Sequence, residues 1–113
     1  MKETKLGDFE ETLLLIVGIL DEEAYAFKIA AEFKDQLNRV VSIGAVHSTL
    51  KRLSDKGFLI SNMGDPTAER GGRRKRIYTI TGAGQRALKE SRDIKLSLWN
   101  QFPAFANLKF NVG

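Results

Sequence analysis

Five basic side chains within seven positions are the strongest chemical feature of this sequence. They are Arg70, Arg73, Arg74, Lys75 and Arg76. The 113-residue chain has 18 basic and 14 acidic residues, so its net charge is +4. Without the five, 13 basic residues stand against the 14 acidic ones, and the segment therefore carries the whole positive excess. A solvated loop is one explanation, but charge this concentrated favours contact with a polyanion.

The sequence contains few residues that could serve in catalysis or bind a metal. The chain has no cysteine, and His47 is its single histidine. Disulfides and thiolate zinc sites are therefore excluded, and a Ser-His-Asp arrangement would depend on His47 alone. Residues 82–87 match the G-x-G-x-x-A dinucleotide fingerprint, but a predicted helix follows instead of the second parallel strand of that fold. We expect no enzyme, no cofactor and no metal, and a small enzyme using His47 remains the weaker alternative.

The apolar residues predict neither a membrane span nor a signal peptide. The longest apolar run, 13–20, falls far short of the roughly 20 residues that a membrane helix needs. Acidic residues precede this run, where a secretory signal would be basic. We therefore expect no membrane partner and a cytoplasmic location. At this length the chain has room for one domain, or for one small domain with an appendage.

Three helices are predicted before residue 57. Apolar residues recur at three- and four-residue steps over 8–20, 26–37 and 43–56. Ser42 is a candidate N-cap for the third helix, and Gly57 is a candidate stop. Leu14, Leu15 and Ile19 lie off the main stripe of the first helix, so a second face needs cover from the chain's own domain or from a partner chain, and a dimer is the first interpretation. The aromatic residues Tyr25 and Phe27 are expected in the core.

A β-hairpin and one further helix follow. Residues 58–63 and 74–80 are strand-like, and the segment between them is rich in turn formers. Thr81 is a candidate N-cap for a final helix that ends near Phe102, because Pro103 follows. Apolar side chains recur along this helix at helical spacing, and they need cover.

Three helices, a hairpin with a basic tip and one more helix form the layout of an α+β winged helix-turn-helix fold. In this fold the third helix enters the major groove of DNA, while the hairpin, called the wing, follows the phosphate backbone. The candidate DNA contacts on the third helix and its N-cap are Ser42, Ala45, His47, Ser48, Thr49, Lys51 and Arg52, and those on the wing are Arg73, Arg74, Lys75 and Arg76.

Over residues 13–88 the sequence resembles the PadR-like transcriptional regulators. The resemblance is carried by residues 25–29 (Tyr-Ala-Phe-Lys-Ile), by residues 44–53 with the following Lys-Gly-Phe-Leu at 56–59, and by residues 71–84 of the wing and final helix. The family pattern usually has glycine at Ala26 and tyrosine at Phe27 and His47. The His47 difference bears on DNA contact, because the tyrosine there is associated with phosphate binding.

The resemblance is to the short members of the family, which have a single C-terminal helix. It implies a winged-helix DNA-binding domain over 1–81, and a dimerisation helix with its tail over 82–113. It also implies a homodimeric repressor that binds a palindromic operator in double-stranded DNA. In some short members a tryptophan of this helix stacks on planar drugs, so Trp99 and Phe102 are candidates for a planar aromatic effector. The alternative for these aromatic residues is packing in the hydrophobic core of the dimer. The alternative is a winged-helix module for protein interaction or DNA architecture, without sequence-specific binding.

Overall fold

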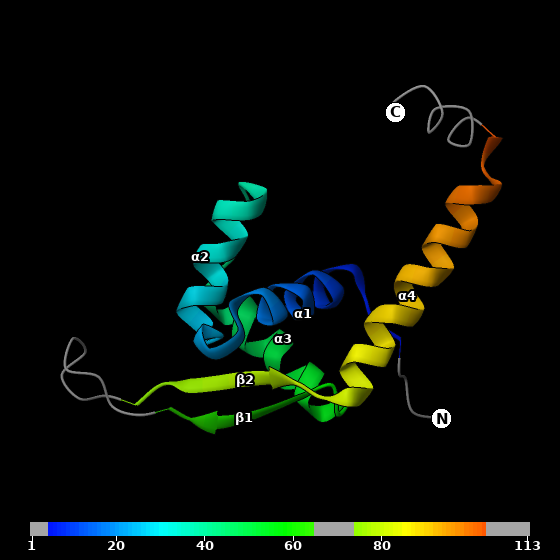
Figure 1. Ribbon diagram of the computed structural model, residues 1–113. Helices are drawn as coiled ribbons and strands as arrows, with labels where there is room; N and C mark the ends of the chain where they lie inside the picture. Colours follow the sequence, from blue (N-terminus) through cyan, green and yellow to red (C-terminus); the bar gives the residue numbers. More distant parts are fainter. Residues whose placement is uncertain (1–4, 65–73, 104–113) are drawn as a thin grey trace.

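The computed structural model describes residues 5–64 and 74–103, and this part of the chain has an α+β fold (Figure 1). Its elements in chain order are α1 (Asp8–Leu20), the 3-10 turn η1 (Asp21–Glu23), α2 (Ala26–Leu37), α3 (Ile43–Asp55), β1 (Leu59–Met63), β2 (Arg76–Ile80) and α4 (Gly82–Gln101). The predicted order of three helices, a hairpin and a fourth helix is confirmed. The largest differences are at the hairpin, where both strands begin one or two residues later than predicted.

Short polar side chains fix the helix ends, as the sequence predicted. The Ser42 hydroxyl accepts a hydrogen bond from the Ala45 N–H at 3.0 Å and so caps α3. The Thr81 hydroxyl accepts one from the Gly84 N–H at 3.0 Å and donates to the Gly57 carbonyl at 2.7 Å. Asn38 ends α2 in the left-handed conformation, with φ 52°. The Ser42 and Thr81 caps are therefore local hydrogen bonds, whereas the Thr81–Gly57 bond joins the start of α4 to the residues that follow α3.

The hydrophobic core lies among α1, α2, α3 and the base of the hairpin. Its fully buried large side chains are Leu13, Leu14, Val17, Ile29, Phe33, Val46, Leu50 and Leu53. The burial of Leu14 widens the core face of α1 beyond the predicted stripe. Leu15 and Ile19 remain about half exposed or more. The expectation that Phe27 lies in the core is wrong, because 64% of its surface is exposed on the outer side of α2.

The wing is an antiparallel hairpin whose strands pair from Leu59↔Ile80 to Met63↔Arg76. It is attached to the helices by the Tyr78 N–H, which donates to the Ala24 carbonyl at 2.9 Å. The predicted hairpin is confirmed in its strands, while residues 65–73, including Arg70 and Arg73, lie outside the described part. This arrangement places the wing beside the start of α2.

Helix α4 packs against the rest of the molecule mainly through its first turns and then extends away from it (Figure 1). Gly84 is its single buried residue. A Cβ atom there would lie 2.4 Å from the Phe58 carbonyl oxygen and 2.8 Å from an Ile80 methyl group. The absence of a side chain at Gly84 therefore allows α4 to approach the base of the wing. None of the helices described here is long and apolar enough to cross a membrane.

Candidate nucleic-acid interface

The outer face of α3 has small and polar side chains. Gly44, Ser48, Lys51 and Asp55 follow one another at steps of four, three and four residues, and all four are exposed. They lie opposite the buried residues Val46, Leu50 and Leu53. The Lys51 ammonium pairs with the Asp55 carboxylate at 3.1 Å. The face combines close access at Gly44 with hydrogen-bonding groups further along the helix.

Of the other residues predicted on this helix, most lie on or beside that face. His47 is exposed, Ala45 is half-buried, and the Ser48 hydroxyl donates to the Ala45 carbonyl at 3.3 Å. Ser42 is exposed at the N-cap. Residues 5–64 and 74–103 contain no group of three or more His, Cys, Asp or Glu side chains that could hold a metal ion. The outer face therefore presents hydroxyl, imidazole and ammonium groups for recognition.

Thr49 is a correction to the predicted contact set. Only 2% of its surface is exposed, because it falls three residues after Val46 and four before Leu53, on the core side of the helix. Its hydroxyl accepts a hydrogen bond from Arg52 Nη2 at 3.1 Å. Thr49 therefore does not lie on the outer face, and instead holds the neighbouring arginine.

Arg52 lies at the edge of the outer face and is held from two sides. Besides Thr49, it contacts Glu10 of α1, whose Oε2 accepts a hydrogen bond from Arg52 Nε at 3.3 Å. Half of the Arg52 side chain, 53%, remains exposed. Sequence reasoning did not find Glu10, which is distant in the chain and belongs to an acidic stretch of ordinary appearance.

The carboxylate of Glu10 is a buried ionic centre between α1 and α3. It accepts hydrogen bonds from the Gly7 N–H at 2.8 Å and from the Lys56 ammonium at 2.9 and 3.1 Å. Burial raises the pKa of Glu10, but the Gly7 N–H, Lys56 and Arg52 together outweigh burial and lower the pKa below its ordinary value. Glu10 is therefore ionised at neutral pH and connects two helices.

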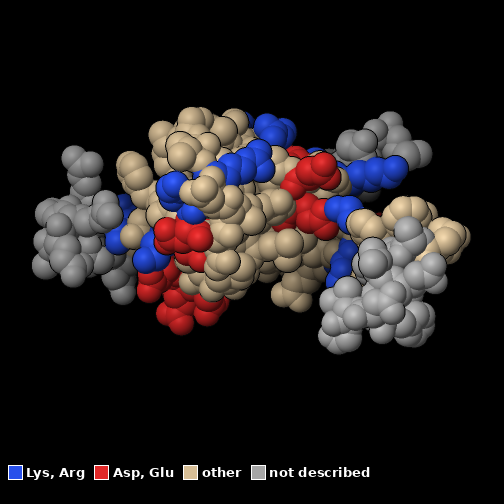
Figure 2. Space-filling model, turned by 90° about the horizontal axis from the view of Figure 1, so that it is seen from above, with Lys and Arg blue, Asp and Glu red and all other residues tan. Residues whose placement is uncertain are grey.

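The described basic side chains of the wing, Arg74, Lys75 and Arg76, lie at the tip end of its strands and are held by neighbouring groups. Arg74 Nε donates to the Gly64 carbonyl at 3.0 Å, and Arg76 Nη1 donates to the Ser61 hydroxyl at 3.1 Å. The Lys75 ammonium lies 4.3 Å from the centre of the Tyr25 ring, a cation–π contact that joins the wing to the start of α2. Arg73 lies outside the described residues. Figure 2 shows lysine and arginine side chains alternating with acidic ones over one face of the molecule.

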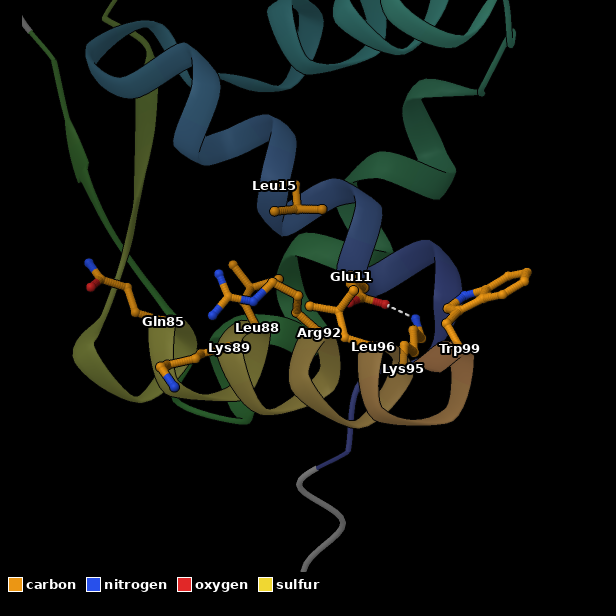
Figure 3. Close-up of a pocket in the computed structure, with 9 residues that line it drawn as sticks. All are labelled: Glu11, Leu15, Gln85, Leu88, Lys89, Arg92, Lys95, Leu96 and Trp99. Carbon is orange, nitrogen blue, oxygen red and sulfur yellow. Dashed lines mark hydrogen bonds and ion pairs between the residues drawn. The ribbon is translucent and has the colours of Figure 1, made fainter. Parts of the chain in front are cut away.

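A second candidate site lies between α1 and α4, where a groove of about 630 Å³ opens (Figure 3). Its lining residues are Glu11, Leu15, Gln85, Leu88, Lys89, Arg92, Lys95, Leu96 and Trp99. The Lys95 ammonium pairs with the Glu11 carboxylate across the groove. Burial raises the pKa of Glu11, but hydrogen bonds from Lys95 and Ser91 outweigh burial and lower it.

The two predicted effector residues lie together at the far end of α4. The ring centres of Trp99 and Phe102 are 6.0 Å apart, with the planes tilted by 54°. Trp99 lines the large groove, whereas Phe102 lines an adjoining hollow of about 270 Å³ with Lys95 and Leu98. Sequence reasoning missed the α1 side of the groove, because nothing local indicates which face of α1 meets α4.

Comparison with known proteins identifies the class of this protein. Residues 15–90 match the model of the transcriptional regulator PadR-like family. The chain therefore belongs to the PadR-like family, which consists of transcriptional regulators rather than enzymes. The resemblance inferred from the motifs is confirmed. A comparison with curated proteins gave no match.

Solved structures of family members have the same fold. A PadR family regulator from Clostridium difficile R20291 is 27% identical, with a TM-score of 0.60 over 80% of this chain and 96% of that one. A PadR-like transcription factor from Bacteroides fragilis is 25% identical, with a TM-score of 0.64 over 88% and 86% of the two chains. PadR of Bacillus subtilis, solved in complex with operator DNA, is 22% identical, with a TM-score of 0.58 over 74% of this chain and 45% of that one.

Proposed function

We propose that this protein is a transcriptional repressor that binds near-palindromic operator DNA as a homodimer. The observation that carries the proposal is the exposed outer face of α3, which stands beside a basic wing on a winged-helix core. The Bacillus subtilis relative was solved with its operator DNA, which supports the same use of the fold here. DNA binding also agrees with the cytoplasmic location expected from the sequence.

In this proposal α3 reads the major groove and the wing binds phosphates. Gly44 admits close approach, while His47, Ser48 and Lys51 offer donors to base edges or phosphates. The remaining proposed contacts are Ser42, Ala45 and Arg52 on α3 with its N-cap, and Arg73, Arg74, Lys75 and Arg76 on the wing. The wing contacts supply affinity that does not depend on sequence, because each cation releases counterions from the DNA.

The proposed dimer forms through α4. Ile94, Leu96, Leu98, Trp99 and Phe102 are each about half exposed or more, an unusual density of apolar surface on one helix. In the proposed dimer, α4 and α1 of the second copy pack against this surface and cover it. The division into a DNA-binding domain over 1–81 and a dimerisation helix with its tail over 82–113 is part of the proposal. A two-fold dimer would place the two α3 helices about one DNA turn, roughly 34–36 Å, apart.

The groove between α1 and α4 is the proposed effector site. Trp99 would stack on a planar aromatic molecule in the groove, beside leucines of both helices, and Phe102 would contact it from the adjoining hollow. The ligand would act by binding better to one angle between α4 and the winged-helix domain than to another. Titration with an acridine dye tests this site, because Trp99 is the only tryptophan and its fluorescence should be quenched. Trp99→Leu should abolish dye binding, and unchanged dye affinity in that variant would contradict the site.

The DNA proposal is tested by selecting duplexes from a random pool and measuring the affinity of the winner at several salt concentrations. We expect an inverted repeat and a steep loss of affinity with salt. Ser48→Ala should weaken binding to the selected duplex more than to unrelated DNA, whereas Lys75→Gln should weaken both and reduce the salt slope by about 1. Weak binding without sequence preference would overturn the repressor proposal and favour an architectural or protein-binding module.

A further inference from the structure

The buried carboxylate of Glu10 holds two basic side chains at once, Arg52 of α3 and Lys56 at the C-cap of that helix. Glu10 is 6% exposed, and its oxygens contact Lys56 at 2.9 and 3.1 Å and Arg52 at 3.3 Å. Lys56 is also tied to the Lys5 carbonyl at 2.8 Å, and its side chain is only 17% exposed. Lys56 therefore belongs to the interior attachment of α3, whereas Arg52 extends to the surface.

The contacts of Arg52 leave part of its guanidinium available. An arginine has five N–H donors in a fixed planar fork. Nε donates to Glu10 and Nη2 donates to Thr49, which fixes the plane of the group against α1 and the core side of α3. Because the side chain is 53% exposed, the outward N–H groups can still meet a DNA oxygen. The guanidinium is thus oriented before DNA arrives.

We infer that Glu10 is a positioning residue that sets the DNA specificity of this protein by holding the Arg52 guanidinium in one orientation at the edge of the recognition helix. The inference rests on the proposed DNA-binding function. A fixed fork matches one arrangement of acceptors and loses little side-chain entropy on binding, so it favours the correct site. It matches poorly where the acceptors lie elsewhere.

The negative charge of Glu10 also favours operator DNA over unrelated DNA. A free arginine at this edge would contact phosphates on any duplex and strengthen sequence-independent binding. The nearby carboxylate partly neutralises Arg52, which reduces this contribution. Glu10 therefore lowers the affinity for unrelated DNA while it preserves the oriented contact with the operator. A residue with a purely structural role would change both affinities alike.

The test compares Glu10→Gln with the unmodified protein on a selected duplex and on an unrelated duplex. The ratio of the affinity for the selected duplex to that for the unrelated duplex should fall about tenfold, which is the discrimination expected from one oriented arginine contact. The salt slope on unrelated DNA should steepen by about 1, because Arg52 becomes a free phosphate contact. Asp93→Asn is the matched control, since Asp93 also joins two basic residues, Lys89 and Arg92, but on the exposed side of α4. It should leave the ratio unchanged.

A second variant keeps the test decisive if Glu10→Gln folds poorly. Arg52→Lys preserves the charge and leaves the Glu10–Lys56 pair in place, but it removes the planar fork, so the ratio should fall by a similar factor. In the Arg52→Gln background, adding Glu10→Gln should change the ratio no further. Equal weakening on both duplexes, or an unchanged ratio in Arg52→Lys, would overturn the inference. If the unmodified protein shows no sequence preference, the proposed function itself fails.

Discussion

The winged-helix part of this protein and its fourth helix differ in how much of their apolar surface the chain itself buries. Helices α1, α2 and α3 enclose a core in which Leu13, Phe33 and Leu50 are completely buried. Helix α4 has 20 residues, yet Gly84 is the only one buried. The first part is complete within one chain. The second exposes apolar surface that is stabilised only when something covers it.

The joint between the two parts is small. Gly84 lets α4 lie against Phe58 and Ile80, and further along, the Lys95 ammonium pairs with Glu11 of α1. A long helix held mainly at one end changes its angle at little cost, whereas a packed core does not deform continuously. In the proposed function, DNA reading therefore falls to the packed winged-helix part and adjustment falls to α4.

The sharpest test of the closed core is Phe33→Ala. The Phe33 ring is fully buried and stacks on Phe9 with 5.1 Å between ring centres. Its removal should lower the free energy of unfolding by about 3–5 kcal/mol, because it leaves a cavity. Urea unfolding measures the change. Phe27→Ala on the same helix is the control and should stay within about 0.5 kcal/mol, since Phe27 is 64% exposed.

The joint is tested by Gly84→Ala. The added methyl group would meet the Phe58 carbonyl oxygen at 2.4 Å, so α4 must shift, and the expected loss of stability is about 1–3 kcal/mol. Gly82→Ala meets only the end of the Arg86 side chain, at 3.4 Å, and should be neutral or slightly stabilising. Equal stability of the two variants in thermal unfolding would show that the close approach at Gly84 is not required.

The ionic link within the rigid part predicts a pH dependence. The folded-state pKa of Glu10 is lowered, so its contribution to stability is present above the ordinary value of 4.5 and is lost as pH falls from there through the folded pKa. Glu10→Gln should therefore cost about 1–2 kcal/mol at pH 7 and progressively less below pH 4.5. Unfolding in urea at several pH values measures this. A gap that does not narrow in acid would contradict the ionic role of Glu10.

The open character of α4 is tested by Leu98→Ala. Because Leu98 is 62% exposed, the stability of the separate chain should change by less than about 0.5 kcal/mol. The proposed dimer should nevertheless dissociate about tenfold more readily, because the proposed apolar contact between copies is lost. Sedimentation over a range of protein concentrations measures the dissociation of the dimer, and urea unfolding measures the stability of the chain. Glu90→Ala, an exposed polar site on the same helix, is the control and should leave dissociation unchanged.

Some site residues followed directly from the sequence, and others were beyond it. The outward positions of His47, Ser48 and Lys51 follow from the period of one helix. Thr49 differs from the prediction because its hydroxyl is typical of a surface residue, whereas its position three residues after Val46 and four before Leu53 places it on the core side. The sequence indicated the α4 side of the groove through Trp99. It did not indicate the α1 side, because that side depends on how two helices distant in the chain cross.

The sequence by itself determined the order of the helices and the hairpin, the caps that begin α3 and α4, and the family, because these depend on periodicity and on caps that act within one or two turns. Ser42 and Thr81 needed only near neighbours to set the start of α3 and α4. Only the tertiary structure decided that Glu10 meets Arg52 and Lys56, residues 42 and 46 positions away. It also decided that Phe27 faces outward and that α4 stays uncovered. Such pairings depend on which faces of separate elements pack together, and local sequence preferences do not specify that choice.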